Sequence, residues 1–157
     1  MNKMNKIIEI KGLHKVFITE TGQHVHALED INMDIYEQDF VCIIGPSGSG
    51  KSTLLRLMEG LISPTKGNIT VAGKPVTGPL PQAGMVFQEY SLMPWRNVID
   101  NVAFGLELRG VPKQERYKTC KKILDRFGLI DFLYSFPYEL SGGMKQRTVI
   151  AVSTILS

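Results

Sequence analysis

The clearest chemistry in this sequence lies in one glycine-rich segment. It reads Gly45-Pro46-Ser47-Gly48-Ser49-Gly50-Lys51-Ser52. The segment matches the pattern G-x-x-x-x-G-K-[ST], a loop whose backbone N–H groups surround phosphate oxygens. Because Cβ atoms would block that approach, Gly48 and Gly50 suit it. Lys51 is suited to the terminal phosphates, Ser52 to Mg²⁺ and Thr53 to an inner phosphate. We therefore predict phosphate binding here rather than an ordinary Gly-Ser turn.

The residues on either side have the pattern that such a loop requires. Residues 40–44 are continuously apolar and are followed at once by Gly45, which predicts a short parallel strand buried on both faces. Cys42 would be buried within it. Residues 52–61 place leucines at helical spacing, and Gly60 marks the end of that helix. A strand, the loop and a helix are thus expected in order.

The rest of the chain divides into a mixed half and a helical half. Alternating apolar residues predict strands over 7–17 and 27–35, a turn over 19–23, and short strands over 67–73 and 84–87. Helical spacing begins at Val98, breaks at 110–112 and resumes near Lys113, with Cys120 on the apolar side. We expect an α/β core over 1–90 and a helical part over 91–157.

Composition narrows the class of protein. Of 157 residues, 43% are hydrophobic and 21% charged, which is typical of a globular chain. No run approaches the length of a membrane-spanning helix and no signal-peptide pattern opens the chain, so we expect a cytoplasmic protein. The net charge of +3 and the basic face of the helix after Lys113 do not indicate a nucleic acid partner. His24 and His26 lack an evident third metal ligand, and two reduced cysteines are expected to be inert.

A second motif makes the first one specific. It reads Leu140-Ser141-Gly142-Gly143-Met144-Lys145-Gln146-Arg147 and resembles the signature of the ATP-binding subunits of ABC transporters. A Ser hydroxyl, two glycines and a helix N-terminus form an anion site, although Ser-Gly-Gly alone also suits a helix cap. The resemblance implies that Leu140 to Met144 and Gln146 close on ATP bound to a second subunit. It also implies a P-loop NTPase core, with an incomplete parallel sheet and an antiparallel β segment, plus a helical subdomain.

Further positions match the same family. Gln88 resembles the Q-loop glutamine, which meets Mg²⁺ and the attacking water, and Phe17 resembles the aromatic that stacks on adenine. A core position for Phe17 remains the alternative. Residues 91–106, with Pro94-Trp95 as the marker, resemble the branch serving nitrate, sulfonate, taurine and bicarbonate importers. Trp95 is equally compatible with a role as a helix-packing anchor.

The family pattern is incomplete in this sequence. The resemblance continues to about residue 151, and no run of four apolar residues followed by Asp-Glu occurs in the sequence. The aspartate that positions Mg²⁺, the glutamate that polarises water and the switch histidine are therefore missing. We expect a truncated form that is unable to hydrolyse ATP.

The resemblance implies a transport role with several partners. We expect an ATP- and Mg²⁺-binding subunit that energises import of a small anion, peripheral on the inner face of the membrane. Its implied partners are a permease, contacted through the Q-loop and helical subdomain, a second ATP-binding subunit, and a periplasmic or extracellular solute-binding protein. Two alternatives are a non-catalytic fragment that only docks on a permease or full-length subunit, and a P-loop nucleotide kinase, against which the signature argues.

Overall fold

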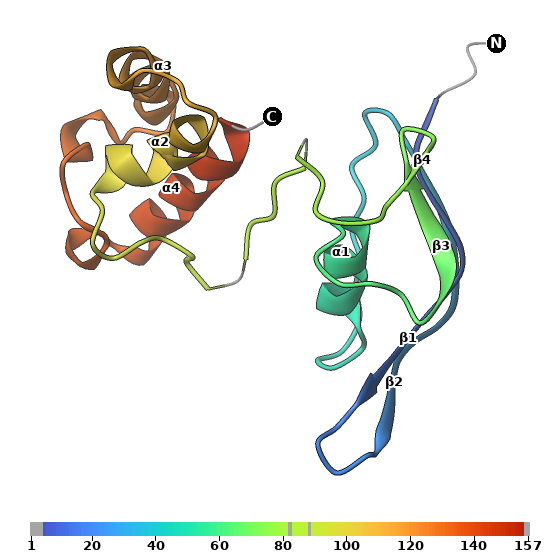
Figure 1. Ribbon diagram of the computed structural model, residues 1–157. Helices are drawn as coiled ribbons and strands as arrows, with labels where there is room; N and C mark the ends of the chain where they lie inside the picture. The colour runs from blue at the N-terminus through green and yellow to red at the C-terminus, as the bar shows by residue number, and fades with distance from the viewer. Residues whose placement is uncertain (1–4, 82, 88, 156–157) are drawn as a thin grey trace. The chain divides into compact units, whose positions relative to one another are not determined.

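The computed structural model describes residues 5–81, 83–87 and 89–155. Residues 1–80 and 81–157 form two compact units, and each is described by itself. In their described residues, the first holds a four-stranded sheet and one short α-helix, and the second is helical (Figure 1). Within the described residues, no helix has both the length and the apolar character needed to cross a bilayer.

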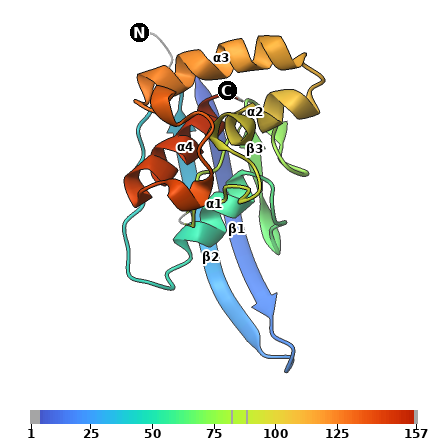
Figure 2. The same ribbon diagram turned by 90° about the vertical axis from the view of Figure 1, so that its left-hand side faces the viewer.

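The first unit is built on a long antiparallel hairpin. Strands β1 (Lys6–Ile18) and β2 (His24–Tyr36) run side by side (Figure 2), joined by the predicted turn over 19–23. Strand β3 (Lys66–Val71) pairs with the other edge of β1, and the two-residue β4 (Lys74–Pro75) completes the order β2-β1-β3-β4. The strands predicted over 7–17, 27–35 and 67–73 are confirmed, with small shifts at their ends.

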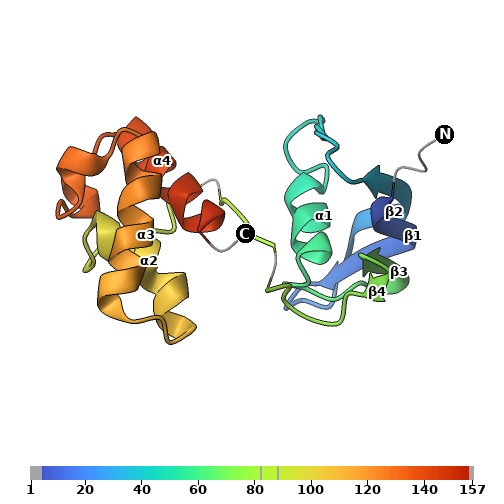
Figure 3. The ribbon, with the colours of Figure 1, turned by 90° about the horizontal axis from the view of Figure 1, so that it is seen from above.

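Helix α1 (Lys51–Met58) covers one face of this sheet (Figure 3). Leucines of the helix and inward-facing residues of β1, β2 and β3 form the core of the unit, because burying both apolar faces removes them from water. The buried members are Ile10, Leu13, Leu28, Leu54, Leu57 and Ile69. The packing fixes where α1 begins, and with it the end of the glycine-rich loop.

Two strand predictions are wrong. Residues 39–46 contain no strand, Cys42 is exposed, and Phe40 and Ile44 are 94% and 93% exposed. Residues 84–87 contain no strand either. A buried parallel strand needs hydrogen-bonded neighbours, and the described residues supply none to these segments, so all pairing in the sheet is antiparallel.

In its described residues, the second unit contains three α-helices and two short 3₁₀ turns. The α-helices are α2 (Val98–Leu108), α3 (Lys113–Arg126) and α4 (Gly142–Thr154), with η1 (Ile130–Phe132) and η2 (Pro137–Glu139) between α3 and α4. Both α3 and α4 pack on α2 (Figure 3). Their shared core consists mainly of Val98, Ile99, Val102, Cys120, Leu124, Leu129 and Ala151. Cys120 lies on the apolar side of α3, as predicted.

Candidate functional site

The glycine-rich loop runs directly into α1 and turns at two glycines. Gly48 and Gly50 have φ of +81° and +84°, a region that glycine enters without the clash that a Cβ causes. A Cβ on Gly50 would lie 2.5 Å from the Ala27 carbonyl oxygen of β2, whereas one on Gly48 would meet open space. Gly50 is therefore needed for packing against β2, and Gly48 leaves an open approach to the loop backbone.

The Lys51 ammonium lies across the loop. It donates to the carbonyl oxygens of Gly45 at 2.9 Å and Pro46 at 2.6 Å, and to Ser49 Oγ at 3.2 Å. The Ser52 side chain, one residue further, is exposed. A cation beside a glycine turn that is open at Gly48, at a helix N-terminus, has the chemistry that phosphate oxygens require, so the residues present fit a polyphosphate.

Two other predicted site residues lie apart from the loop in sequence. Phe17 stands near the end of β1 opposite Val25, is 41% exposed, and has Lys15 Nζ 5.0 Å from its ring centre. The exposure argues against a core position for Phe17. Gln88 lies outside the described residues. The marker residue Trp95 is 74% exposed, which contradicts its alternative role as a helix-packing anchor.

The second motif forms the start of α4. Ser141 is its N-cap, and the Ser141 hydroxyl accepts a hydrogen bond from Met144 N at 3.3 Å. Leu140 is buried, whereas Gly142, Gly143 and the Gln146 side chain are exposed. The polar part of the motif thus faces solvent, while Leu140 joins the core of the helical unit.

Two contacts near this motif were not predicted. A Cβ on Gly142 would lie 3.2 Å from the Tyr90 hydroxyl, so Tyr90 lies over the first glycine. Arg147 donates to the Phe127 carbonyl oxygen at 2.9 Å and ties α4 to the end of α3. Nothing in the local sequence around Tyr90 signals its position, because the contact joins segments about 50 residues apart.

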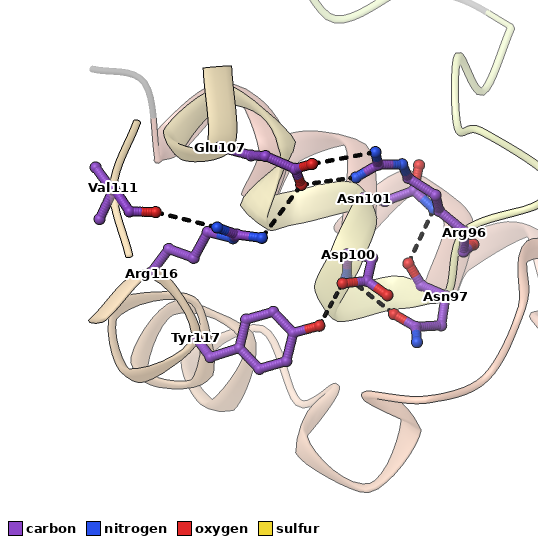
Figure 4. Close-up of polar contacts among 8 residues, drawn as sticks. All are labelled: Arg96, Asn97, Asp100, Asn101, Glu107, Val111, Arg116 and Tyr117. Carbon is purple, nitrogen blue, oxygen red and sulfur yellow. Dashed lines mark hydrogen bonds and ion pairs between the residues drawn. The ribbon is translucent and has the colours of Figure 1, made fainter. Parts of the chain in front are cut away.

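A polar network supports α2 (Figure 4). Arg96 and Arg116 both contact the Glu107 carboxylate, and the hydrogen bond from Arg96 is the main reason that the pKa of Glu107 is lowered. The Tyr117 hydroxyl donates to Asp100. Burial is the main cause that raises the pKa of Tyr117 to about 12, and that hydrogen bond is the second.

Burial also raises the pKa of the Cys120 thiol to about 11, which agrees with the expectation that this cysteine is chemically inert.

A metal site built from protein side chains is not evident. In the described part of the chain, no three His, Cys, Asp or Glu side chains are grouped to hold an ion. His24 and His26 are both exposed, near the β1–β2 turn.

Comparisons with known proteins agree with the two motifs. The family model described as ABC transporter matches residues 28–157. The chain is 55% identical over 146 residues to the nitrate import ATP-binding protein of Synechocystis sp., covering 93% of this chain and 54% of that protein. It is 42% identical over 144 residues to the taurine import ATP-binding protein of Roseobacter denitrificans, and this match covers 92% of this chain and 54% of that protein. The chain therefore spans about half the length of these curated relatives.

Solved structures confirm the expected fold class. A dimeric bacterial ABC transporter cassette is similar with a TM-score of 0.84 at 31% identity, covering 94% of this chain and 68% of that one. A post-hydrolysis state of the cassette bound to ADP and Pi gives a TM-score of 0.85 at 30% identity, with the same coverage.

Proposed function

Because the chain belongs to the ABC transporter family, we propose that it is the ATP-binding part of an importer for a small anion such as nitrate, a sulfonate, taurine or bicarbonate. The observation that carries the proposal is the open glycine turn with the Lys51 ammonium beside it. Relatives named for nitrate and taurine import support this class of solute. The kinase alternative has no comparable support.

The site residues have distinct proposed roles. The loop over residues 45–53 would hold the phosphates through its backbone N–H groups, Pro46 excepted. Lys51 would neutralise their terminal charge, and Ser52 and Gln88 would serve Mg²⁺. Phe17 offers an exposed ring to the adenine. In this family, cleavage of the β–γ phosphoanhydride bond of ATP bound to a complete subunit would supply the free energy for transport. In this scheme, residues 1–90 form the nucleotide-binding core and 91–157 the helical part.

The exposed signature supports a partner in trans. Ser141, Gly142 and Gly143 present a hydroxyl and a helix start to solvent, so they suit the γ-phosphate held by a second ATP-binding subunit. A solved relative is described as dimeric. We propose the remaining partners from the family resemblance: a permease, a solute-binding protein outside the cell, and a position on the inner face of the membrane.

Hydrolysis by the 157-residue polypeptide is not expected. Its sequence contains no apolar run ending in Asp-Glu, so no residue of that type orients the attacking water. We propose that this polypeptide binds nucleotide without turning it over. If it binds none, the docking alternative holds instead, in which the chain only contacts a permease or a full-length subunit.

A nucleotide titration tests the proposal. Purified chain is titrated with ATP in Mg²⁺ and in EDTA, and released phosphate is measured in parallel. We expect saturable binding that is tighter with Mg²⁺, and no phosphate release above the protein-free control. Absence of saturable binding under both conditions contradicts a working phosphate loop, and turnover at rates ordinary for enzymes, about 1 s⁻¹ or more, contradicts the proposed inactivity.

A further inference from the structure

The excess positive charge of the chain is concentrated in one helix. Residues 1–80 hold eight basic and eight acidic residues, whereas residues 81–157 hold ten basic and seven acidic ones. Helix α3 alone contains six basic and two acidic residues, a net charge of +4, and the rest of its unit is slightly acidic. The net charge of +3 therefore comes from α3 and is not spread over the surface.

The fold keeps this charge on the outer side of α3. The apolar side of the helix packs on α2 and α4, and Figures 1 and 2 show α3 at the margin of the helical unit. Four cations lie on the opposite side at positions i, i+3, i+4 and i+8, and all four side chains are exposed. These residues, called the basic face below, are Lys118, Lys121, Lys122 and Arg126.

The acidic residues of α3 do not neutralise the basic face. Glu115 and Asp125 each lie about one turn from a lysine of this face, a spacing that permits an ion pair on a helix surface. In the part of the chain that the structure describes, none of the four cations forms an ion pair. Arg116 differs, because it contacts the Glu107 carboxylate. The charge of the basic face is therefore open to a partner outside the chain.

The chemistry of the basic face fits a diffuse anionic surface. Three of its four members are lysines, whose ammonium groups are point charges without the rigid fork of an arginine. The aromatic residue of α3, Tyr117, bonds to Asp100 of α2, so α3 offers no ring on which a nucleic acid base could stack. Anionic lipid headgroups attract clusters of four or more basic residues without requiring a fixed geometry.

We propose that the basic face of α3 binds anionic lipid headgroups on the inner leaflet of the membrane. The inference rests on the proposed function, which puts the chain next to a membrane subunit. The contact is made directly with lipid and is separate from any contact with the permease. Because it is ionic and exposed, it is weakened by salt, and each lysine near the leaflet strengthens it by a factor of roughly five.

Sedimentation with lipid vesicles tests the proposal. The 157-residue chain is mixed with vesicles of phosphatidylcholine alone or with about one-third phosphatidylserine, and the bound fraction is measured at low and high salt. We expect binding only to the vesicles with phosphatidylserine, and its loss near about 1 M salt, where charges are screened beyond about 3 Å. Equal binding to both kinds of vesicle, or binding that persists at high salt, overturns the proposal and indicates exposed apolar residues such as Phe40 instead.

A matched pair of double variants locates the contact. Lys121→Gln with Lys122→Gln removes two charges from α3 and is expected to weaken vesicle binding about 30-fold. Lys66→Gln with Lys74→Gln removes the same charge from exposed positions of the sheet and is the control that keeps wild-type binding. Glutamine is a good helix former, and circular dichroism checks that both variants fold. Equal binding by the two variants overturns the assignment to α3.

Two further measurements separate this proposal from its rivals. Preference of the chain for a DNA oligonucleotide over the phosphatidylserine vesicles, compared at equal phosphate concentration, overturns the proposal and assigns the basic face to nucleic acid. Titration with ATP distinguishes the two levels of the inference. A chain that binds ATP but no vesicles refutes the lipid contact alone, whereas one that binds the vesicles but no ATP supports the lipid contact and refutes the proposed function.

Discussion

Replacing Lys51 with alanine is expected to remove most of the affinity for ATP. The ammonium lies within 2.6–3.2 Å of three oxygen atoms of the loop, so it needs only a small movement to meet a phosphate held there. A hydrogen bond between charged groups contributes about 1.5–3 kcal/mol, which corresponds to a roughly 10- to 100-fold loss of affinity. Lys51 must give up its hydrogen bonds to the loop when it turns to the phosphate, so the expected loss of affinity is nearer 10-fold than 100-fold.

Isothermal calorimetry with Mg²⁺ and ATP measures the change directly. Lys74→Ala is the matched control, because Lys74 lies on β4 of the same unit, is exposed and carries the same charge. Raising the salt concentration is expected to weaken wild-type binding more than binding by Lys51→Ala, since screening acts on the ionic contact. Equal affinities for Lys51→Ala and Lys74→Ala would refute the assignment of Lys51 to the phosphates.

Three further outcomes follow from the two units. Gly50→Ala is expected to lower the melting temperature more than Gly48→Ala. Both substitutions place a Cβ on a left-handed backbone, which costs about 1–2 kcal/mol, but only the Cβ at position 50 meets a carbonyl oxygen of β2. Equal decreases in melting temperature would contradict the packing of Gly50 against β2. Because the pKa of Tyr117 is raised to about 12, its stabilising contribution is present below about pH 10, the ordinary pKa, and is lost as pH rises toward 12. Melting curves of Tyr117→Phe are expected to lack that alkaline decrease, and an identical pH profile would count against it. The exposed side chains of Phe40 and Ile44 favour association between copies of the chain. Changing both residues to serine is therefore expected to raise the fraction of monomer measured by light scattering. An unchanged monomer fraction would show that this segment does not drive association.

Local signals in the sequence predict most of the secondary structure. The hairpin, α1 and the helices after residue 97 follow from alternation, helical spacing and glycine breaks, which depend on near neighbours. The strand predicted over 40–44 does not form, because an apolar segment becomes a strand only when other strands pair with it. Pairing partners are a long-range property that the run itself does not contain.

The candidate site shows the same division between local and distant information. The positive φ of Gly48 and the Ser141 cap are each set by a few consecutive residues, so the motifs predict their own backbone. Tyr90 beside Gly142 depends on contacts between distant segments, and no spacing rule reveals it.

The role of Asn101 is only partly predictable from the local sequence. An asparagine between Val98 and Val102, on the apolar side of a predicted helix, is a detectable anomaly, because a buried amide must be hydrogen-bonded. The sequence therefore signals that Asn101 has buried partners, whereas only the structure identifies them as backbone groups of the turn that carries Trp95. A polar residue that interrupts an apolar helix face is thus a useful guide to buried hydrogen bonds, even where the partners are several residues away.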